Sequence, residues 1–128
     1  PSMELPILYA LTYPERLPDM GIRRFDPVTA GPLTFEPVRH EVFRAFALGV
    51  AAGRTGGTAP AVFNAANEVA VAAFLAEEIG FGRIAEVVER VLAAHRPEPA
   101  DDLEAIRTAD GWARTEARAA VEGVPSRP

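Results

Sequence analysis

The chain has 128 residues, enough for one modest domain, with 48% hydrophobic and 24% charged residues and a formal net charge of −5. Acidic and basic residues are interspersed without a basic patch, which argues against nucleic acid or an anionic membrane as a partner. The absence of cysteine excludes disulfides and thiolate chemistry, and no run approaches the roughly 18 apolar residues of a membrane span.

Residues 1 to about 13 are predicted to form a short helix. Pro6 suits a first turn, and Pro14 disfavours helical geometry at the residue before it. Apolar residues recur there at helical spacing: Leu5, Ile7, Leu8 and Leu11. A helix this short cannot bury its own stripe, so we expect it to lie against a larger body. The sequence begins at Pro1 rather than at methionine and shows no signal peptide, which favours a break inside a longer reading frame.

Residues from about 14 to 40 are predicted to form a semi-extended arm. Prolines and glycines recur throughout this stretch: Pro14, Pro18, Gly21, Pro27, Gly31, Pro32 and Pro37. A structureless loop of this length is unusual inside one compact domain, and a partly ordered linker is the alternative. Residues 24–26 and 33–35 are each candidates for a short strand.

A helical period begins at Glu41 and is predicted to stop at Gly53, before a turn over residues 54–57. Its apolar face consists of Phe43, Phe46, Ala47 and Val50. Gly49 costs a helix interior about 1 kcal/mol relative to alanine, so we expect close packing at this position.

The longest helical pattern runs from Thr58 to Gly80. Thr58 is the predicted cap, Pro60 lies in the first turn, and Gly80 suits the left-handed conformation past a helix end. Most faces of this helix are apolar, which is typical of a helix buried among others.

Three polar residues interrupt the middle of this central helix: Asn64, Asn67 and Glu68. Buried polar groups need hydrogen-bond partners. We predict a structural polar network that fixes how neighbouring helices dock, because no complementary acid, base or nucleophile accompanies the set. A functional polar site in the bundle is the alternative.

The remaining helices follow Gly82. An amphipathic helix has Ile84, Val87, Val88, Val91 and Leu92 facing inward, and Glu86 and Arg90 form a favourable pair one turn apart. Asp101 or Asp102 can cap a short helix through Ile106, and Thr108 a last helix to about Val121. Trp112 is predicted to be a core or docking anchor. The fold class is mainly α: a small helical bundle, residues 41–122, preceded by a Pro-rich arm with at most short strands.

Candidate chemical motifs are weak. Residues 53–58 resemble a phosphate loop, but they lack its lysine and a preceding strand, so an ordinary turn is the better interpretation. His40 and His95 lie in different elements without metal-ligand spacing, which favours surface or helix-end histidines. The residues alone thus predict a helical bundle with an extended arm and no reaction.

Several short sequence segments are more informative about the family of this chain than the spacing of its apolar residues. They are Pro1-Ser2-Met3, residues 5–7 and 10–16, Leu33-Thr34-Phe35, the stretch from Gly56 to Val71, and Ala109 to Arg114. In this order and spacing the chain resembles the C-terminal portion of the 1-deoxy-D-xylulose 5-phosphate reductoisomerase family. The resemblance implies that residues 1–14 end the catalytic domain, 15–40 form a linker arm, 41–122 form the C-terminal helical domain and 123–128 are a disordered tail.

The resemblance implies a cytoplasmic, homodimeric enzyme of the non-mevalonate isoprenoid pathway. Such an enzyme converts 1-deoxy-D-xylulose 5-phosphate to 2-C-methyl-D-erythritol 4-phosphate with NADPH and a divalent ion, Mg²⁺, Mn²⁺ or Co²⁺. The family's dinucleotide fingerprint, acidic metal site and phosphate-binding residues have no counterparts here, so this segment is expected to be architectural and inactive alone, with no catalytic, cofactor or metal residues.

The resemblance transfers one local site, in which Pro1 and Met3 form part of the apolar wall over the substrate. Ser2 departs from the family's usual aspartate between them. A free-standing helical interaction module of the same ancestry is the alternative hypothesis for the whole chain.

Overall fold

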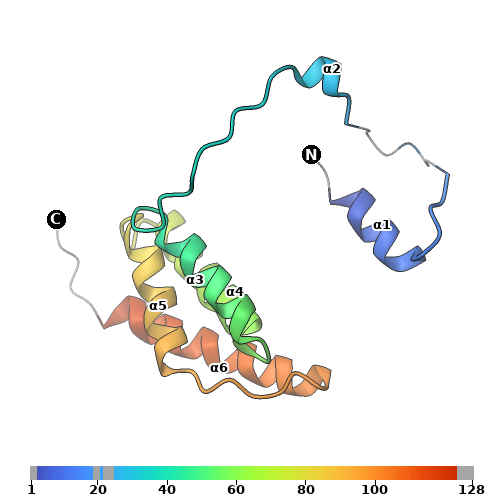
Figure 1. Ribbon diagram of the computed structural model, residues 1–128. Coiled ribbons are helices and arrows are strands. Elements are labelled where there is room, and N and C mark those ends of the chain that lie inside the picture. Colours follow the sequence, from blue (N-terminus) through green and yellow to red (C-terminus); the bar gives the residue numbers. More distant parts are fainter. Residues whose placement is uncertain (1–2, 19–20, 22–24, 124–128) are drawn as a thin grey trace. The chain divides into compact units, whose positions relative to one another are not determined.

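The computed structural model describes residues 3–18, 21 and 25–123 (Figure 1). All regular secondary structure in these ranges is helical, which confirms the predicted mainly α class. The helices are α1 (Glu4–Thr12), α2 (Pro27–Ala30), α3 (Arg44–Thr55), α4 (Ala59–Leu75), α5 (Arg83–Ala94) and α6 (Leu103–Glu122). The chain divides into two compact units, Pro1–Pro37 and Val38–Pro128.

The first unit contains α1 and α2. Helix α1 ends where Tyr13 turns to an extended ψ of 135° ahead of Pro14, as the steric effect of proline requires. The prediction of short strands is wrong for the described residues, which include 33–35 but not Arg24. Instead Asp26 accepts a hydrogen bond from the Val28 N–H at 2.9 Å and caps the single turn of α2. An isolated extended segment has no neighbouring strand to pair with, whereas this cap is local.

Helix α3 begins later and ends later than predicted, at Arg44 and Thr55 rather than at Glu41 and Gly53. Gly56 ends it with a φ of 71°. The predicted close packing at Gly49 is confirmed, because a Cβ atom there would lie 3.1 Å from the ring of Phe63 on α4.

Helix α4 stops at Leu75, so the predicted end at Gly80 is wrong. Glu77 adopts the left-handed conformation with a φ of 61°, although it is not glycine. The N–H of Glu78 then donates to Ala73 at 2.9 Å, and that of Glu77 donates to Phe74 at 3.0 Å. These bonds satisfy carbonyls that the helix end leaves free, and therefore close the helix before the glycine is reached.

Helices α5 and α6 complete the bundle. The predicted inward residues of α5 are buried, except Leu92, which is half-buried. Glu86 pairs with Arg83 at 2.9 Å rather than with Arg90. The two predicted helices at 101–106 and 108–121 are one continuous helix, α6.

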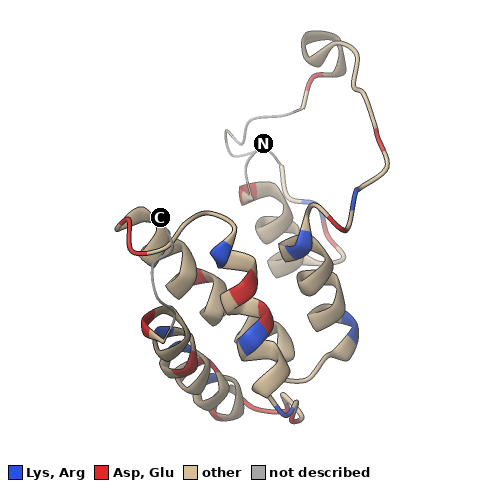
Figure 2. Cartoon of the chain, turned by 90° about the vertical axis from the view of Figure 1, so that its left-hand side faces the viewer, with Lys and Arg blue, Asp and Glu red and all other residues tan. Residues whose placement is uncertain are grey.

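The core lies where α4 packs against α5 and α6. Alanines form the buried stripe of α6: Ala109, Ala113, Ala117 and Ala120. Buried alanines also dominate α4, so the two backbones approach closely, and α5 supplies the larger valines. Charged residues of both signs are distributed along the helices of the bundle (Figure 2). Arg44 of α3 and Glu89 of α5 form an ion pair.

Candidate functional site

Apolar side chains of α1 are the first candidate surface. Leu5, Ile7 and Leu11 are 55%, 54% and 80% exposed, and helix α1 has no buried residue. Met3 is the N-terminal cap residue of this helix and is 68% exposed. Pro1, the other residue of the predicted substrate wall, lies outside the described residues, as does Ser2. Exposed apolar side chains are typical of surfaces that contact another body.

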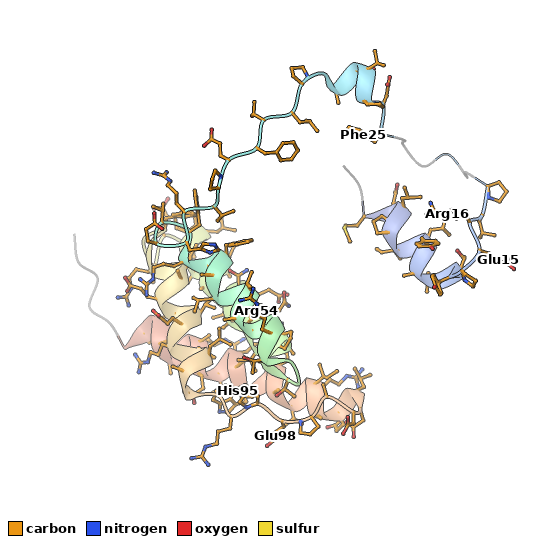
Figure 3. The ribbon with its side chains drawn as sticks, in the orientation of Figure 1. Glu15, Arg16, Phe25, Arg54, His95 and Glu98 are labelled. Carbon is orange, nitrogen blue, oxygen red and sulfur yellow. The ribbon has the colours of Figure 1, made fainter. Side chains whose placement is uncertain are left out.

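Local polar contacts hold the end of α1. The Thr12 hydroxyl bonds to the backbone carbonyl of Leu8 at 3.1 Å. The guanidinium carbon of Arg16, which is labelled in Figure 3, lies 4.7 Å from the centre of the Tyr9 ring in a cation–π contact. These contacts leave the apolar side chains open.

The second candidate is a polar network between α4 and α6. Asn64 donates to Glu68 at 2.9 Å, and Glu68 accepts a hydrogen bond from Arg114 at 2.7 Å. Arg114 also donates to Asp110 at 2.8 Å. Asn67 lies half-buried on α4, and the bonds described here do not include it.

The contacts within this network favour the charged forms of Glu68 and Arg114. The hydrogen bond from Arg114, and then that from Asn64, lower the pKa of Glu68 below its ordinary value. The two carboxylates raise the pKa of Arg114. A carboxylate held ionised in this way is poorly suited to act as a general acid near neutral pH. About half of the Glu68 side chain is exposed, so solvent screens the ion pair and its contribution to stability is small.

The third candidate is an open groove of about 540 Å³ in the second unit. Its lining comes from the start of α4, the end of α5, the segment between α5 and α6, and α6 itself, and includes Thr58, His95, Glu98, Thr108 and Trp112. Figure 3 shows His95 and Glu98 along the connecting segment. The ring centres of His95 and Trp112 are 5.2 Å apart.

Thr58 lies at the predicted cap position of α4, but its side chain makes no cap bond there. Its hydroxyl oxygen instead lies 2.9 Å from His95 Nε2 and accepts the backbone N–H of Glu98 at 3.1 Å. The N–H of Thr58 donates to the Glu98 carbonyl at 2.9 Å. The Thr58 N–H in this turn is therefore already bonded to a protein carbonyl and is not free to bind a phosphate. This supports an ordinary turn over a phosphate loop.

The histidines lie apart, as predicted. His40 packs against the Phe46 ring, with centres 5.6 Å apart, and His95 caps the C-terminal end of α5. Over residues 3–18, 21 and 25–123, no group of three or more His, Asp or Glu side chains is placed to hold a metal ion. In the same ranges, no helix has the length and apolar character needed to cross a membrane.

Sequence reasoning missed three of these contacts. Asp110 and Arg114 are one helical turn apart within the predicted helix 108–121, so their pairing was detectable as an i,i+4 signal. Thr58 forms hydrogen bonds with His95 and Glu98, which lie 37 and 40 positions further along the chain. No local sequence pattern predicts contacts at such separations.

Comparisons with known proteins complete the description. Residues 1–116 match the family described as "DXP reductoisomerase C-terminal domain". The chain is similar to 1-deoxy-D-xylulose 5-phosphate reductoisomerases of Moorella thermoacetica and Heliobacterium modesticaldum. Identity to the first is 50% over 123 residues, covering 96% of this chain and 32% of the relative. Identity to the second is 52% over 114 residues, covering 89% and 29%.

A solved structure agrees with these relatives. It is the 1-deoxy-D-xylulose 5-phosphate reductoisomerase from Zymomonas mobilis in complex with NADPH, with a TM-score of 0.76 and 38% sequence identity. The match covers 97% of this chain and 32% of that one. The chain thus spans about a third of the length of the proteins it matches.

Proposed function

Because this chain belongs to the family of DXP reductoisomerase C-terminal domains, we propose that it serves as the C-terminal third of a 1-deoxy-D-xylulose 5-phosphate reductoisomerase. The complete enzyme would convert 1-deoxy-D-xylulose 5-phosphate to 2-C-methyl-D-erythritol 4-phosphate, as a cytoplasmic homodimer of the non-mevalonate isoprenoid pathway. NADPH would supply the hydride, and Mg²⁺, Mn²⁺ or Co²⁺ would polarise the substrate oxygens.

The described residues do not fit either cofactor. They offer no cluster of metal ligands, and the turn before α4 lacks the strand and lysine of a phosphate loop. We therefore assign NADPH and metal binding to the other two thirds of the enzyme. The role of this segment is architectural, with Pro1 and Met3 proposed as its contribution to the substrate wall.

The exposed apolar face of α1 carries this proposal. Leaving Leu5, Ile7 and Leu11 in water forgoes about 25 cal/mol for each Å² of apolar surface that could be buried. A helix with no buried residue of its own has little reason to carry such a stripe unless another part of the protein covers it. The catalytic portion of the enzyme is the body we propose.

The test uses this chain and the remainder of the Moorella enzyme. The purified chain is expected to show no NADPH oxidation dependent on 1-deoxy-D-xylulose 5-phosphate. Joined in frame to the part of the Moorella enzyme that precedes the matched third, it is expected to restore that activity. Activity of the purified chain by itself would refute the architectural role.

A matched pair of variants probes the apolar face within the fusion. Leu11→Glu is expected to abolish or strongly reduce activity, because it places a charge on the stripe that must be covered. Leu103→Glu, at a 59% exposed leucine on α6, is the control and is expected to retain activity. If the fusion folds but is inactive even without a substitution at Leu11 or Leu103, that result would favour the free-standing interaction module.

A further inference from the structure

We propose that Thr58 and His95 form a pH-sensitive latch that holds the α5–α6 connecting segment, residues 95–102, against the turn between α3 and α4. The latch lies wholly within the second unit and does not depend on the proposed function. It would make the packing of this segment, and the shape of the groove it lines, respond to mildly acidic pH.

Three hydrogen bonds anchor the segment at one point. Thr58 and Glu98 exchange two of them, from the Thr58 N–H to the Glu98 carbonyl at 2.9 Å and from the Glu98 N–H to the Thr58 hydroxyl at 3.1 Å. The third joins the hydroxyl to His95 Nε2 at 2.9 Å. Thr58 is only 1% exposed, so solvent cannot replace a partner that is lost.

The backbone leaves room for this arrangement only because residue 57 is glycine. Gly57 has a φ of 53°, and a Cβ atom there would overlap the Glu98 carbonyl oxygen. The connecting segment therefore packs directly against the backbone of the α3–α4 turn.

The proton positions follow from the donors available. The Thr58 oxygen already accepts the Glu98 N–H, and its own single hydrogen needs an acceptor because the side chain is buried. His95 Nε2 lies at bonding distance and can accept that hydrogen only when the imidazole is neutral. Protonation turns Nε2 into a donor, and the Thr58 hydrogen loses its acceptor.

The groups around His95 come from every element packed against it. The α3–α4 turn presents the uncharged Thr58, and α6 presents Trp112, whose ring centre is 5.2 Å away. The charged residues that line the same groove are Arg96, Glu98, Asp102 and Glu104. Burial lowers the pKa of His95 below the ordinary 6.5, and the nearby charge of Glu98 opposes this in part.

The direction of the response follows from that shift. A histidine whose pKa is lower in the folded state binds fewer protons when folded than when unfolded, so stability rises with pH through this range. The contribution of the latch is therefore complete above the unfolded pKa and is lost as the pH falls towards the lower, folded value.

The experiment uses the 128-residue chain, which contains only two histidines and one tryptophan. Amide exchange at Thr58 and Glu98 is measured as a protection factor from about pH 7.5 to about pH 5.5, a range that brackets the ordinary histidine pKa. Protection of both amides is expected to fall several-fold on acidification. Trp112 emission is expected to change with the same midpoint, because the imidazole that titrates lies beside its ring.

Four variants separate the latch from general acid sensitivity. His95→Gln is expected to remove the pH step in both signals, whereas His40→Gln should preserve it. Thr58→Val is expected to weaken Glu98 protection at every pH, and Thr58→Ser, which keeps the hydroxyl, should restore it. Should Thr58→Val fail to fold, the serine and histidine variants still decide.

Two outcomes would overturn the latch. One is Glu98 protection that stays constant while the His95 ring protonates, observed by NMR of its ring protons. The other is an unchanged pH step in His95→Gln.

Discussion

Among the described glycines, Gly57 is the one at which an added Cβ would meet the nearest backbone atom. It combines a left-handed φ of 53° with the closest approach of the Glu98 carbonyl. Gly111 offers the opposite case, since it lies in the middle of α6, is exposed, and has no atom within 4 Å of a built Cβ.

These two glycines give a residue-scale prediction. Gly57→Ala is expected to lower the free energy of unfolding by about 1–3 kcal/mol, from left-handed strain and the clash with Glu98. Gly111→Ala is expected to raise it by roughly 0.5–1 kcal/mol, because alanine is the better helix former. Urea unfolding measures both. A stability loss at Gly111 as large as that at Gly57 would contradict the proposed approach of the two segments.

The central polar residues illustrate what a residue-scale hypothesis leaves open. Asn64 and Glu68 belong to the predicted polar network, and in the structure Asn64 donates to Glu68, which also accepts a hydrogen bond from Arg114 on α6. Asn67 is half-buried on the same helix. Whether the set of three fixes helix docking remains a prediction, which the melting temperature of Asn67→Leu would test.

At the scale of elements, α6 shows how one local signal overrides another. Thr108 was predicted to start a new helix, but α6 runs through it without a break. The buried alanines of α6 lie on one stripe that begins at Ala109, directly after this residue, and ends at Ala120. Asp102 has already capped the helix before Thr108, and a threonine in a helix interior costs only tenths of a kcal/mol, so Thr108 does not begin a new helix.

The start of α6 gives the element-scale prediction. Asp102 caps it, with its Oδ1 accepting the Ala105 N–H at 2.7 Å. Asp102→Ala is expected to cost about 0.5–2 kcal/mol, because an N–H of the first turn loses its partner. Asp101→Ala is the matched control and is expected to change stability by less than about 0.5 kcal/mol. Equal losses in thermal unfolding would show that the neighbouring aspartates share the cap.

At the scale of the whole molecule, every described residue in the buried core lies between Ala52 and Ala120. The first unit contributes none of them, although its apolar side chains are numerous. The chain therefore combines one unit that carries its own core with another whose apolar surface is unsatisfied by its own residues.

A truncation at this boundary gives the third prediction. The segment 38–123 is expected to melt within a few degrees of the full chain, because it keeps every described core residue. For comparison, a loss of about 1 kcal/mol of stability would lower Tm by roughly 4–8 °C. Amide exchange in the full chain should show α1 unprotected while α4 and α5 are protected. A much lower Tm for the truncated chain, or strong protection throughout α1, would show that the first unit is stabilised by the second.

The sequence by itself determined the helical class, the family and the inward face of α5, because each of these depends on residues close together in the chain. A period of 3.6 residues marks Ile84, Val87, Val88 and Val91 without knowledge of their partners. The string around Asn64 to Glu68 identifies the family by its order alone.

Only the structure showed where α4 ends and that α6 is continuous, and only tertiary contacts decided what Thr58 does. Thr58 was correctly predicted at the start of α4, yet its hydroxyl forms hydrogen bonds with His95 and Glu98, 37 and 40 residues further along the chain. Local conformational preferences differ by only tenths of a kcal/mol between residues, whereas a buried hydroxyl left without a hydrogen-bond partner costs about 1–3 kcal/mol. Where the two compete, the distant partner decides, and no spacing in the sequence records it.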